Sequence, residues 1–130
     1  MITHLDHLVL TTINLEKCLD FYQRVLKMQV IIFGDQRYAL QFGEQKINIH
    51  QYGKELEPKA HLPVPGALDL CFITSESLDK VITHIKSEGM TILEGPVNRT
   101  GAMGAISSIY LRDPDLNLIE ISQYIEESTN

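Results

Sequence analysis

Four side chains in this sequence could together bind one metal ion: His7, His50, Asp69 and Glu120. Two imidazoles and two carboxylates form a ligand set that suits Zn, Ni, Co, Mn or Fe(II). The two carboxylates also balance the charge of a divalent cation. Because a carboxylate that faces a protein interior is costly without a cation or hydrogen bonds, Glu120 in particular requires partners.

Each of the four residues also has a simpler structural explanation. A histidine on a half-buried strand commonly forms hydrogen bonds within the core, and Asp69 could accept a hydrogen bond from a neighbouring backbone amide. Glu120 could pair with Arg37 or Arg112 instead of a metal. The metal interpretation is favoured because all four residues occur at matching places in a repeated pattern and share the inward side of their segments.

The elements that must position these residues follow from the spacing of apolar side chains. Alternating apolar residues predict strands, whereas apolar residues at 3.6-residue spacing after Asn14, a good N-cap, predict a helix. The first half of the chain is therefore expected to contain a strand at 3–11, a helix at 14–26, and strands at 29–33, 37–42 and 46–52. This order is βαβββ.

The same order begins again after a connector at residues 54–66, which carries three prolines. We expect a strand at 67–74, a helix that starts at Ser75 or Ser77 and ends at Gly89, and strands at 90–94, 105–111 and 118–123. The glycine-rich residues 95–104, including Arg99, are predicted to form a mobile loop. Residues 1–130 thus form one α+β domain with modules at about 3–53 and 67–124.

Aligning the two modules brings the four candidate ligands to matching places. His7 aligns with Asp69 in the first strand of each module. In the last strand, His50 aligns with Glu120 or, one pleat further on, with Ser122, and both alignments keep His50 on the inward side. If the modules pack as a pseudo-symmetric pair, the four side chains can meet in one cleft.

Two neighbours on the same faces are candidates for contacting a substrate. Asn48 shares the face of His50 and is the fallback ligand if the register differs by one pleat. Cys71 shares the face of Asp69 and could line the cleft, although a small buried filler is its simpler role.

The overall charge and the absence of sorting signals limit the classes of partner. A net charge of −6 argues against nucleic acid and anionic membranes, which are bound mainly through an excess of Lys and Arg. No signal-peptide pattern and no apolar run of membrane-spanning length are present, so a cytoplasmic location is expected. Two cysteines without a CxxC spacing fit that reducing compartment. A small molecule is the expected partner.

Three motifs resemble the vicinal oxygen chelate superfamily, the glyoxalase/bleomycin-resistance/extradiol-dioxygenase group. They are Leu-Asp-His-Leu-Val-Leu at 5–10, Asp-Phe-Tyr-Gln-Arg-Val-Leu at 20–26 and Arg-Asp-Pro-Asp-Leu-Asn-Leu-Ile-Glu at 112–120. Further segments at 46–51, 67–74 and 95–102 are similar to small glyoxalase-domain-containing proteins, some labelled virulence-associated. The resemblance implies two βαβββ modules that form a curled mixed sheet around a metal cleft, and a homodimer that often shares its active site.

The resemblance also implies roles for individual residues. His7 matches the first metal ligand of the family and Glu120 the last, whereas His50 and Asp69 stand where glyoxalase I enzymes have Glu and His. The implied activity is that of a metal-dependent, lactoylglutathione-lyase-like enzyme, in which a metal polarises two neighbouring oxygens and a carboxylate moves a proton through an enediolate. Glu120 is the first candidate for this base and Asp69 the second.

Other activities of the family remain alternatives. Arg99 could hold an anionic part of the substrate, or could be a solvated surface charge. A ring-cleaving dioxygenase would use Fe(II) held by two histidines and one carboxylate. A bleomycin-resistance-type protein would bind a small molecule in the cleft without a metal. Elemental analysis and an assay with methylglyoxal and a thiol distinguish these activities.

Overall fold

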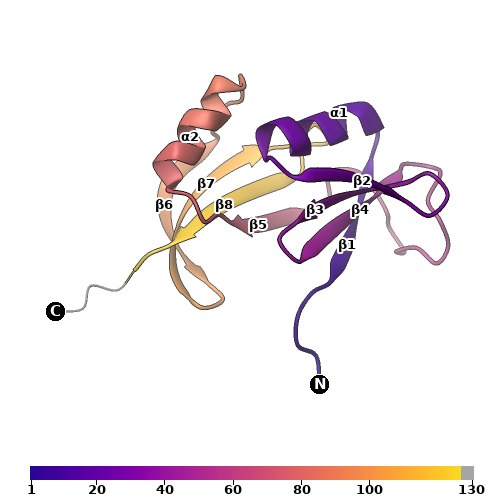
Figure 1. Cartoon of the computed structure of the whole chain (residues 1–130), viewed down its shortest axis with the longest axis horizontal. Helices are drawn as coiled ribbons and strands as arrows, with labels where there is room; N and C mark the ends of the chain where they lie inside the picture. The colour runs from indigo at the N-terminus through magenta and orange to yellow at the C-terminus, as the bar shows by residue number, and fades with distance from the viewer. Residues whose placement is uncertain (127–130) are drawn as a thin grey trace. The chain divides into compact units, whose positions relative to one another are not determined.

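The computed structural model describes residues 1–126, which fall into two compact units. Unit 1 comprises residues 1–68 together with the turn at 114–117, and unit 2 comprises residues 69–113 and, among the described residues, 118–126. Each unit has one four-stranded sheet with one helical segment (Figure 1). The prediction of two βαβββ modules is confirmed.

Unit 1 contains β1 (His7–Thr12), α1 (Leu15–Asp20), a π-helical turn η1 (Phe21–Val25), β2 (Gln29–Phe33), β3 (Arg37–Phe42) and β4 (Gln45–Gln51). Its strands lie in the order β1-β4-β3-β2, with β1 parallel to β4 and the other neighbours antiparallel. The side chain of Asn14 accepts a hydrogen bond from the backbone of Lys17 and caps α1 as expected. Side chains of the helical segment and of one sheet face form the core, including Cys18, Tyr22, Leu10, Leu40 and Ile47.

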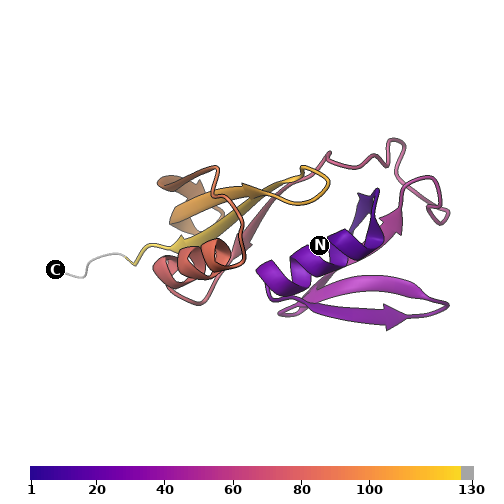
Figure 2. The ribbon, with the colours of Figure 1, turned by 90° about the horizontal axis from the view of Figure 1, so that it is seen from above.

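Unit 2 repeats this topology with β5 (Asp69–Ile73), α2 (Leu78–Ser87), β6 (Glu94–Gly101), β7 (Gly104–Arg112) and β8 (Leu118–Tyr124). The strand order is β5-β8-β7-β6, and again the first and last strands of the module are parallel neighbours. Ser77 caps α2, whose Leu78 and Ile85 are buried. Each helical segment lies along its own sheet (Figure 2).

The expectation of a strand at 90–94 followed by a loop at 95–104 was wrong. Residues 94–101 form β6, an edge strand that pairs with β7 through Gly101 opposite Gly104. Pro96 cannot donate a ladder hydrogen bond, but an edge strand with a register irregularity between Glu94 and Val97 accommodates it. Proline and glycine therefore occur in an irregular strand here, and only the tight turn between Gly101 and Gly104 remains of the predicted loop.

The first strand of each unit is shorter than expected at its N-terminal end. β1 begins at His7 and β5 begins at Asp69, so the two residues that align between the modules occupy the same place in their strands.

Within residues 1–126, no helix combines the length and the apolar character that crossing a lipid bilayer requires.

Candidate functional site

The register of β1 against β4 places three candidate residues on one face of the unit 1 sheet. His7 lies opposite Lys46, Val9 opposite Asn48, and Thr11 opposite His50. Because residues directly opposite in neighbouring strands point to the same side, His7, Asn48 and His50 share a face. Leu10 and Ile47 have the other parity and are buried in the core with the helical segment.

His7 is fixed in one tautomer by its neighbour. Its Nδ1 lies 2.8 Å from Oδ1 of Asp6 on the exposed edge of the unit. An ionised carboxylate can only accept, so Nδ1 donates, and in the neutral form of the imidazole Nε2 is the nitrogen that carries the lone pair. The pKa of Asp6 is lowered, chiefly by this hydrogen bond. A carboxylate behind a histidine in this way is the common support of a metal-binding imidazole.

Asn48 and His50 carry buried polar atoms without hydrogen-bond partners among the described residues. These atoms are Asn48 Oδ1 and His50 Nε2. Burial, and secondarily the charge of Arg37, lowers the pKa of His50, so its imidazole is neutral at pH 7. Because an unpaired buried polar atom is costly, each of these two atoms is available to accept or share a hydrogen bond with water or with a bound ligand.

The two residues differ in how far they lie from His7 along the sheet. Asn48 is two residues and His50 four residues beyond Lys46, the partner of His7 in the register. At about 3.3 Å per residue, His50 is displaced by about 13 Å along the strand and Asn48 by about half of that. His50 also lines a cavity under the connector, with Thr11 and Val64.

In unit 2, the carboxylate of Glu120 is held by two serine hydroxyls. Its Oε2 accepts hydrogen bonds from Ser108 Oγ at 2.7 Å and from Ser122 Oγ at 3.2 Å. Both serines are fully buried, and their hydroxyls lie 2.6 Å apart. These bonds fix the orientation of the carboxylate and leave Oε1 outside the serine network.

Asp69 and Cys71 share the face of Glu120. The register places Asp69 opposite Leu118 and Cys71 opposite Glu120. Cys71 Sγ lies 3.3 Å from Ser122 Oγ. Cys71 is an exposed residue and not the buried filler that its type suggested. Partial desolvation of its sulfur raises the pKa of Cys71, so the side chain is a neutral thiol at pH 7 and not a thiolate nucleophile. Asp69 is exposed at the start of β5.

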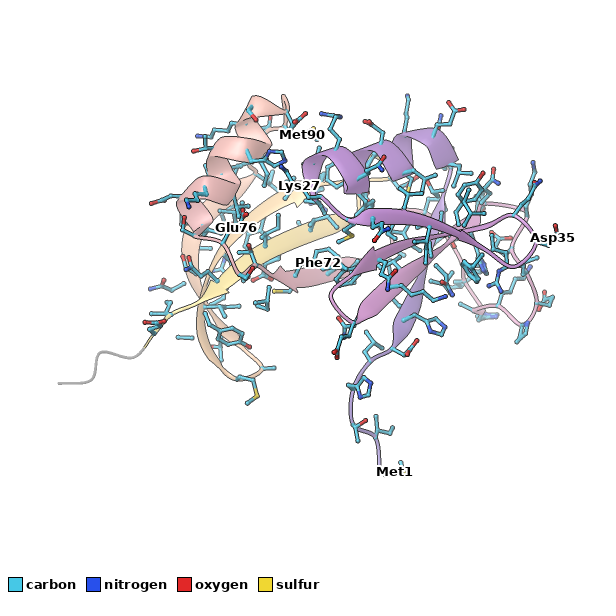
Figure 3. All side chains as sticks on the ribbon, in the orientation of Figure 1. Met1, Lys27, Asp35, Phe72, Glu76 and Met90 are labelled. Carbon is cyan, nitrogen blue, oxygen red and sulfur yellow. The ribbon has the colours of Figure 1, made fainter. Side chains whose placement is uncertain are left out.

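The opposite face of this sheet belongs to the core. Phe72, labelled in Figure 3, has the other parity along β5 and lies opposite Ile121 of β8. Ile119 and Ile121 on β8 are buried. The alternation along β5 and β8 therefore separates a polar face, which carries Glu120, from an apolar face.

Arg99 lies on β6 and not on a loop, and its guanidinium already has partners. Nε donates to the hydroxyl of Tyr110 at 3.0 Å, Nη1 to the carbonyl of Asn98 at 3.0 Å, and Nη2 to Oε1 of Glu94 at 3.4 Å. The guanidinium carbon lies 5.5 Å from the centre of the Tyr110 ring. The hydrogen bond to Tyr110 is the main reason that the pKa of Arg99 is raised.

Ser108, Ser122 and Tyr110 are the polar residues around Glu120 that sequence reasoning missed as site residues. Alternation along β7 puts Ser108 and Tyr110 on one face, but the sequence does not tell which residues of β8 lie opposite them. The register supplies this information: Ser108 pairs with Ser122, and Tyr110 with Glu120.

The registers also decide which residues correspond between the units. His7 and Asp69 both begin the first strand, with Lys46 and Leu118 opposite them. Two residues further on, Asn48 in unit 1 corresponds to Glu120 in unit 2, and His50 corresponds to Ser122. Of the two alignments that the sequence allowed, the structure supports the one that pairs His50 with Ser122.

The donor types on these faces fit a divalent metal, although no complete cluster is formed. Among residues 1–126, no group of three His, Cys, Asp or Glu side chains is placed to hold a metal ion. The unit 1 face offers Nε2 of His7 and the unpaired Oδ1 of Asn48, and unit 2 offers the carboxylates of Asp69 and Glu120. An imidazole nitrogen and amide or carboxylate oxygens are each ligand types that divalent cations accept.

Comparison with known proteins agrees with this architecture. A family model described as the Glyoxalase/Bleomycin resistance protein/Dioxygenase superfamily matches residues 4–121. The glyoxalase domain-containing protein RDO1 of Mycosarcoma maydis is 56% identical over 120 residues, which cover 92% of this chain and 68% of RDO1. The virulence protein STM3117 of Salmonella typhimurium is 54% identical over 96% of this chain and 87% of its own sequence.

Solved structures show the same fold. The crystal structure of STM3117 superposes with a TM-score of 0.95 and covers 96% of this chain and 99% of that one. A lactoylglutathione lyase from Agrobacterium tumefaciens superposes with a TM-score of 0.73 at 16% identity and covers 95% of each chain. This more distant likeness shows the fold alone.

Proposed function

Because the chain belongs to the Glyoxalase/Bleomycin resistance protein/Dioxygenase superfamily, we propose that it is a metal-dependent lyase of the glyoxalase I kind. Its substrate is a small molecule with two neighbouring oxygens, such as the adduct of a 2-oxoaldehyde with a thiol. The observation that carries the proposal is the carboxylate of Glu120, held through Oε2 by two buried serines so that Oε1 is available to a reacting group.

The proposed metal ligands are His7, Asp69 and Glu120, with Asn48 or His50 as the fourth. The sequence favours His50, but Asn48 occupies the place in unit 1 that Glu120 occupies in unit 2. The bound divalent ion supplies Lewis-acid polarisation of the two substrate oxygens. The support for His7 is its fixed tautomer, because Asp6 leaves Nε2 as an acceptor.

Glu120 is a proposed ligand in the absence of substrate, and it is the proposed general base once the substrate displaces it. Its Oε1 takes the proton from the carbon beside the substrate carbonyl and returns it to the adjacent carbon, while Ser108 and Ser122 hold Oε2 in place. Asp69 is the second candidate, with a shorter and exposed side chain. Arg99, Asn48 and Cys71 are proposed to contact the substrate, and Cys71 does so as a neutral thiol.

The expected setting of the enzyme is a cytoplasmic homodimer with a small-molecule substrate. The net charge of −6 supports a small molecule as the partner over nucleic acid or an anionic membrane. The dimer is proposed from the family resemblance.

The test combines metal analysis with a matched pair of variants. The purified protein is reconstituted with Zn, Ni, Co, Mn or Fe(II) and assayed with methylglyoxal and a panel of thiols. We expect Glu120→Gln to lower kcat/KM by about 100-fold or more, the usual contribution of a positioned base. Glu76→Gln, a change at an exposed glutamate outside the sheet, should leave kcat/KM unchanged.

A second candidate function is metal-free binding of a small molecule. The mainly apolar cavity beside His50 favours it. Absence of turnover with every metal, together with saturable binding of an organic ligand, would replace the lyase proposal with metal-free binding.

Oxygen uptake with a catechol substrate would instead identify a ring-cleaving dioxygenase. Turnover that survives Glu120→Gln would remove Glu120 from the chemistry.

A further inference from the structure

Two of the eleven lysines and arginines of this chain differ from the others in burial. Arg37 at the start of β3 and Lys46 on β4 are half-buried, whereas every other lysine and arginine is exposed. Within the described residues 1–126, neither side chain forms an ion pair or donates a hydrogen bond. Because a partly buried charge is costly without a partner, this cation pair, Arg37 and Lys46, lacks the counter-charge that its burial requires.

Both members of the cation pair lie against one aromatic ring, that of Phe33 on β2. The guanidinium carbon of Arg37 is 4.7 Å from the ring centre, and Nζ of Lys46 is 3.9 Å from it. An aromatic face attracts a cation but does not neutralise it, and two like charges held close together repel each other. The ring therefore fixes two positive charges side by side and leaves them unbalanced.

The registers place the cation pair and Phe33 on one face of the unit 1 sheet. Phe33 lies opposite Arg37, and Lys46 lies opposite Gln41, which has the same parity as Arg37 along β3. His7 shares this face, but it lies on β1, at the other edge of the sheet from β2. At about 4.8 Å between neighbouring strands, the two edges are about 14 Å apart. The cation pair thus gathers at the edge far from His7.

The side chain of Arg37 is held in place along its length. Gly34, in the turn between β2 and β3, has a φ of +55°, and a Cβ at this position would lie 3.5 Å from Cδ of Arg37. The stem of the arginine therefore runs along the turn, and its guanidinium rests on Phe33. A side chain that is already ordered loses little further freedom when it binds a ligand. Arg37 consequently presents its N–H donors in a largely fixed orientation.

The neighbouring groups that feel these charges do not neutralise them. The charge of Lys46 reaches Asp6, but this carboxylate accepts a hydrogen bond from His7 at 2.8 Å, which is the main reason that the pKa of Asp6 is lowered. Arg37 acts on His50, whose imidazole is neutral at pH 7, chiefly because of burial. An anion from outside the chain is therefore the partner that suits the cation pair.

The chemistry of the two cations indicates an oxyanion. The guanidinium fork binds two oxygens of a carboxylate or phosphate together, and a lysine adds a compact point charge. Two cations favour an anion with more than one charge, and a phosphate monoester carries about −1.5 to −2 at pH 7. The net charge of −6 opposes a polyanion such as nucleic acid. A small ligand with one phosphate group fits best.

We propose that Arg37, Lys46 and Phe33 form a binding site for a phosphate group, either free in solution or carried by a small molecule. The site lies wholly within unit 1 and needs neither a metal nor Glu120. It goes beyond the proposed lyase activity, and the two proposals can fail separately.

The test is an NMR titration of the full-length, metal-free protein at constant ionic strength with inorganic phosphate, glycerol phosphate, acetate and glycerol. Phosphate should shift the Nε–H signal of Arg37 and the ring signals of Phe33 saturably, while Nε–H of Arg99, which donates to Tyr110, stays in place. Acetate should bind more weakly, and glycerol should cause no shift at Phe33. Tighter binding of glycerol phosphate than of inorganic phosphate would identify a phosphorylated small molecule as the ligand, and the reverse order would identify free phosphate.

Matched variants separate a specific site from general attraction of anions. Arg37→Gln and Lys46→Gln should each weaken phosphate binding about three- to tenfold, the usual effect of one hydrogen bond. Arg37→Lys retains the charge and should lose less than Arg37→Gln. Lys54→Gln, at an exposed lysine of the same unit, should leave phosphate binding unchanged. Unchanged methyl signals of the buried Leu40 and Ile47 show that each variant is folded.

Three results would overturn the proposal. The first is the absence of a saturable shift with either phosphate compound, and the second is acetate binding as tightly as phosphate. The third is a loss of phosphate binding in Lys54→Gln as large as in Arg37→Gln and Lys46→Gln, because it would show that the anion responds only to the overall charge.

Discussion

The serine pair behind Glu120 shows what single residues contribute to the site. The alternation of apolar residues at 118–123 predicted that Glu120 faces inward. An inward carboxylate needs partners, so the sequence also predicted that Glu120 has them. The identity of those partners did not follow, because Ser108 lies on another strand and reaches Glu120 only through the pairing of β7 with β8. Small hydroxyl residues also give little signal in a sequence, since they are common in strands and turns alike.

The first residue-scale prediction concerns Ser108. Ser108→Ala removes one of the two serine donors to Glu120 Oε2 and the hydroxyl beside Ser122, all in a buried setting. We expect the free energy of unfolding to fall by about 1–3 kcal/mol. Urea denaturation measures this change. The control is Ser107→Ala on the opposite face of β7, for which a change within about 0.5 kcal/mol is expected; equal effects of both variants would contradict the role of the hydroxyl network.

The second residue-scale prediction concerns Asp6, which orients His7. Asp6→Asn replaces a carboxylate acceptor with an amide and no longer fixes the tautomer of the imidazole. If His7 is a metal ligand, affinity for Zn should fall about 10- to 100-fold, the usual effect of changing such a supporting group. Calorimetric titration provides the measurement, with Asp35→Asn, an exposed turn residue, as the control. Unchanged affinity would argue against His7 as a ligand.

At the scale of elements, sequence patterns succeeded where periodicity and caps agreed. The strands 29–33 and 37–42 were predicted with the bounds that the structure shows, and the helix of the second module begins after Ser77, one of the two predicted caps, and ends at Ser87, shortly before the predicted Gly89. β6 was missed because Gly95 and Pro96 are typical of loops, and pairing with β7 overrides this local preference. Because β6 was predicted as a loop, Arg99 was also predicted to lie on a loop. It lies on β6, where its side chain donates a hydrogen bond to the hydroxyl of Tyr110 on β7.

The element-scale prediction uses Gly95. Its φ is +110°, and a Cβ at this position would lie 2.4 Å from the carbonyl oxygen of Ser108 on β7. Gly95→Ala should therefore destabilise the protein by about 2–4 kcal/mol, through backbone strain and displacement of β6. Gly89→Ala is a matched control, because its φ is +78° and nothing lies within 4 Å of the added carbon.

Thermal or urea unfolding distinguishes the two glycines. For Gly89→Ala only the conformational cost of a positive φ is expected, about 1 kcal/mol. A loss for Gly95→Ala no greater than this would show that β6 is not held against β7 as described.

At the scale of the whole molecule, the two halves repeat one topology but are not equally self-contained. Unit 1 incorporates the turn at residues 114–117 from the second half of the chain. Asp115 Oδ1 accepts from the backbone amide of Ile13 at 2.9 Å, and Asn117 Oδ1 accepts from that of Leu68. The sequence showed the turn chemistry of this segment but not that it completes the first unit, because the contacts span between 49 and 102 residues.

The prediction at this scale concerns Asn117, which is 1% exposed. Asn117→Ala removes the acceptor for the amide of Leu68 and should lower the free energy of unfolding by about 1–3 kcal/mol. Urea denaturation measures this change. Asn98→Ala on exposed β6 serves as the control, and equal effects of the two variants would contradict this role of Asn117.

The turn at residues 114–117, which is part of unit 1 although it lies late in the sequence, has a consequence for the order in which the chain can fold during synthesis. A ribosome synthesises Leu68 well before Asp115 and Asn117, so the nascent N-terminal half emerges with the amides of Ile13 and Leu68 still lacking their final acceptors. Unit 1 can form these two hydrogen bonds only after the turn at residues 114–117 has been synthesised. A chain that ends before Pro114 would lack both acceptors, and we expect its first half to be less stable than in the full chain.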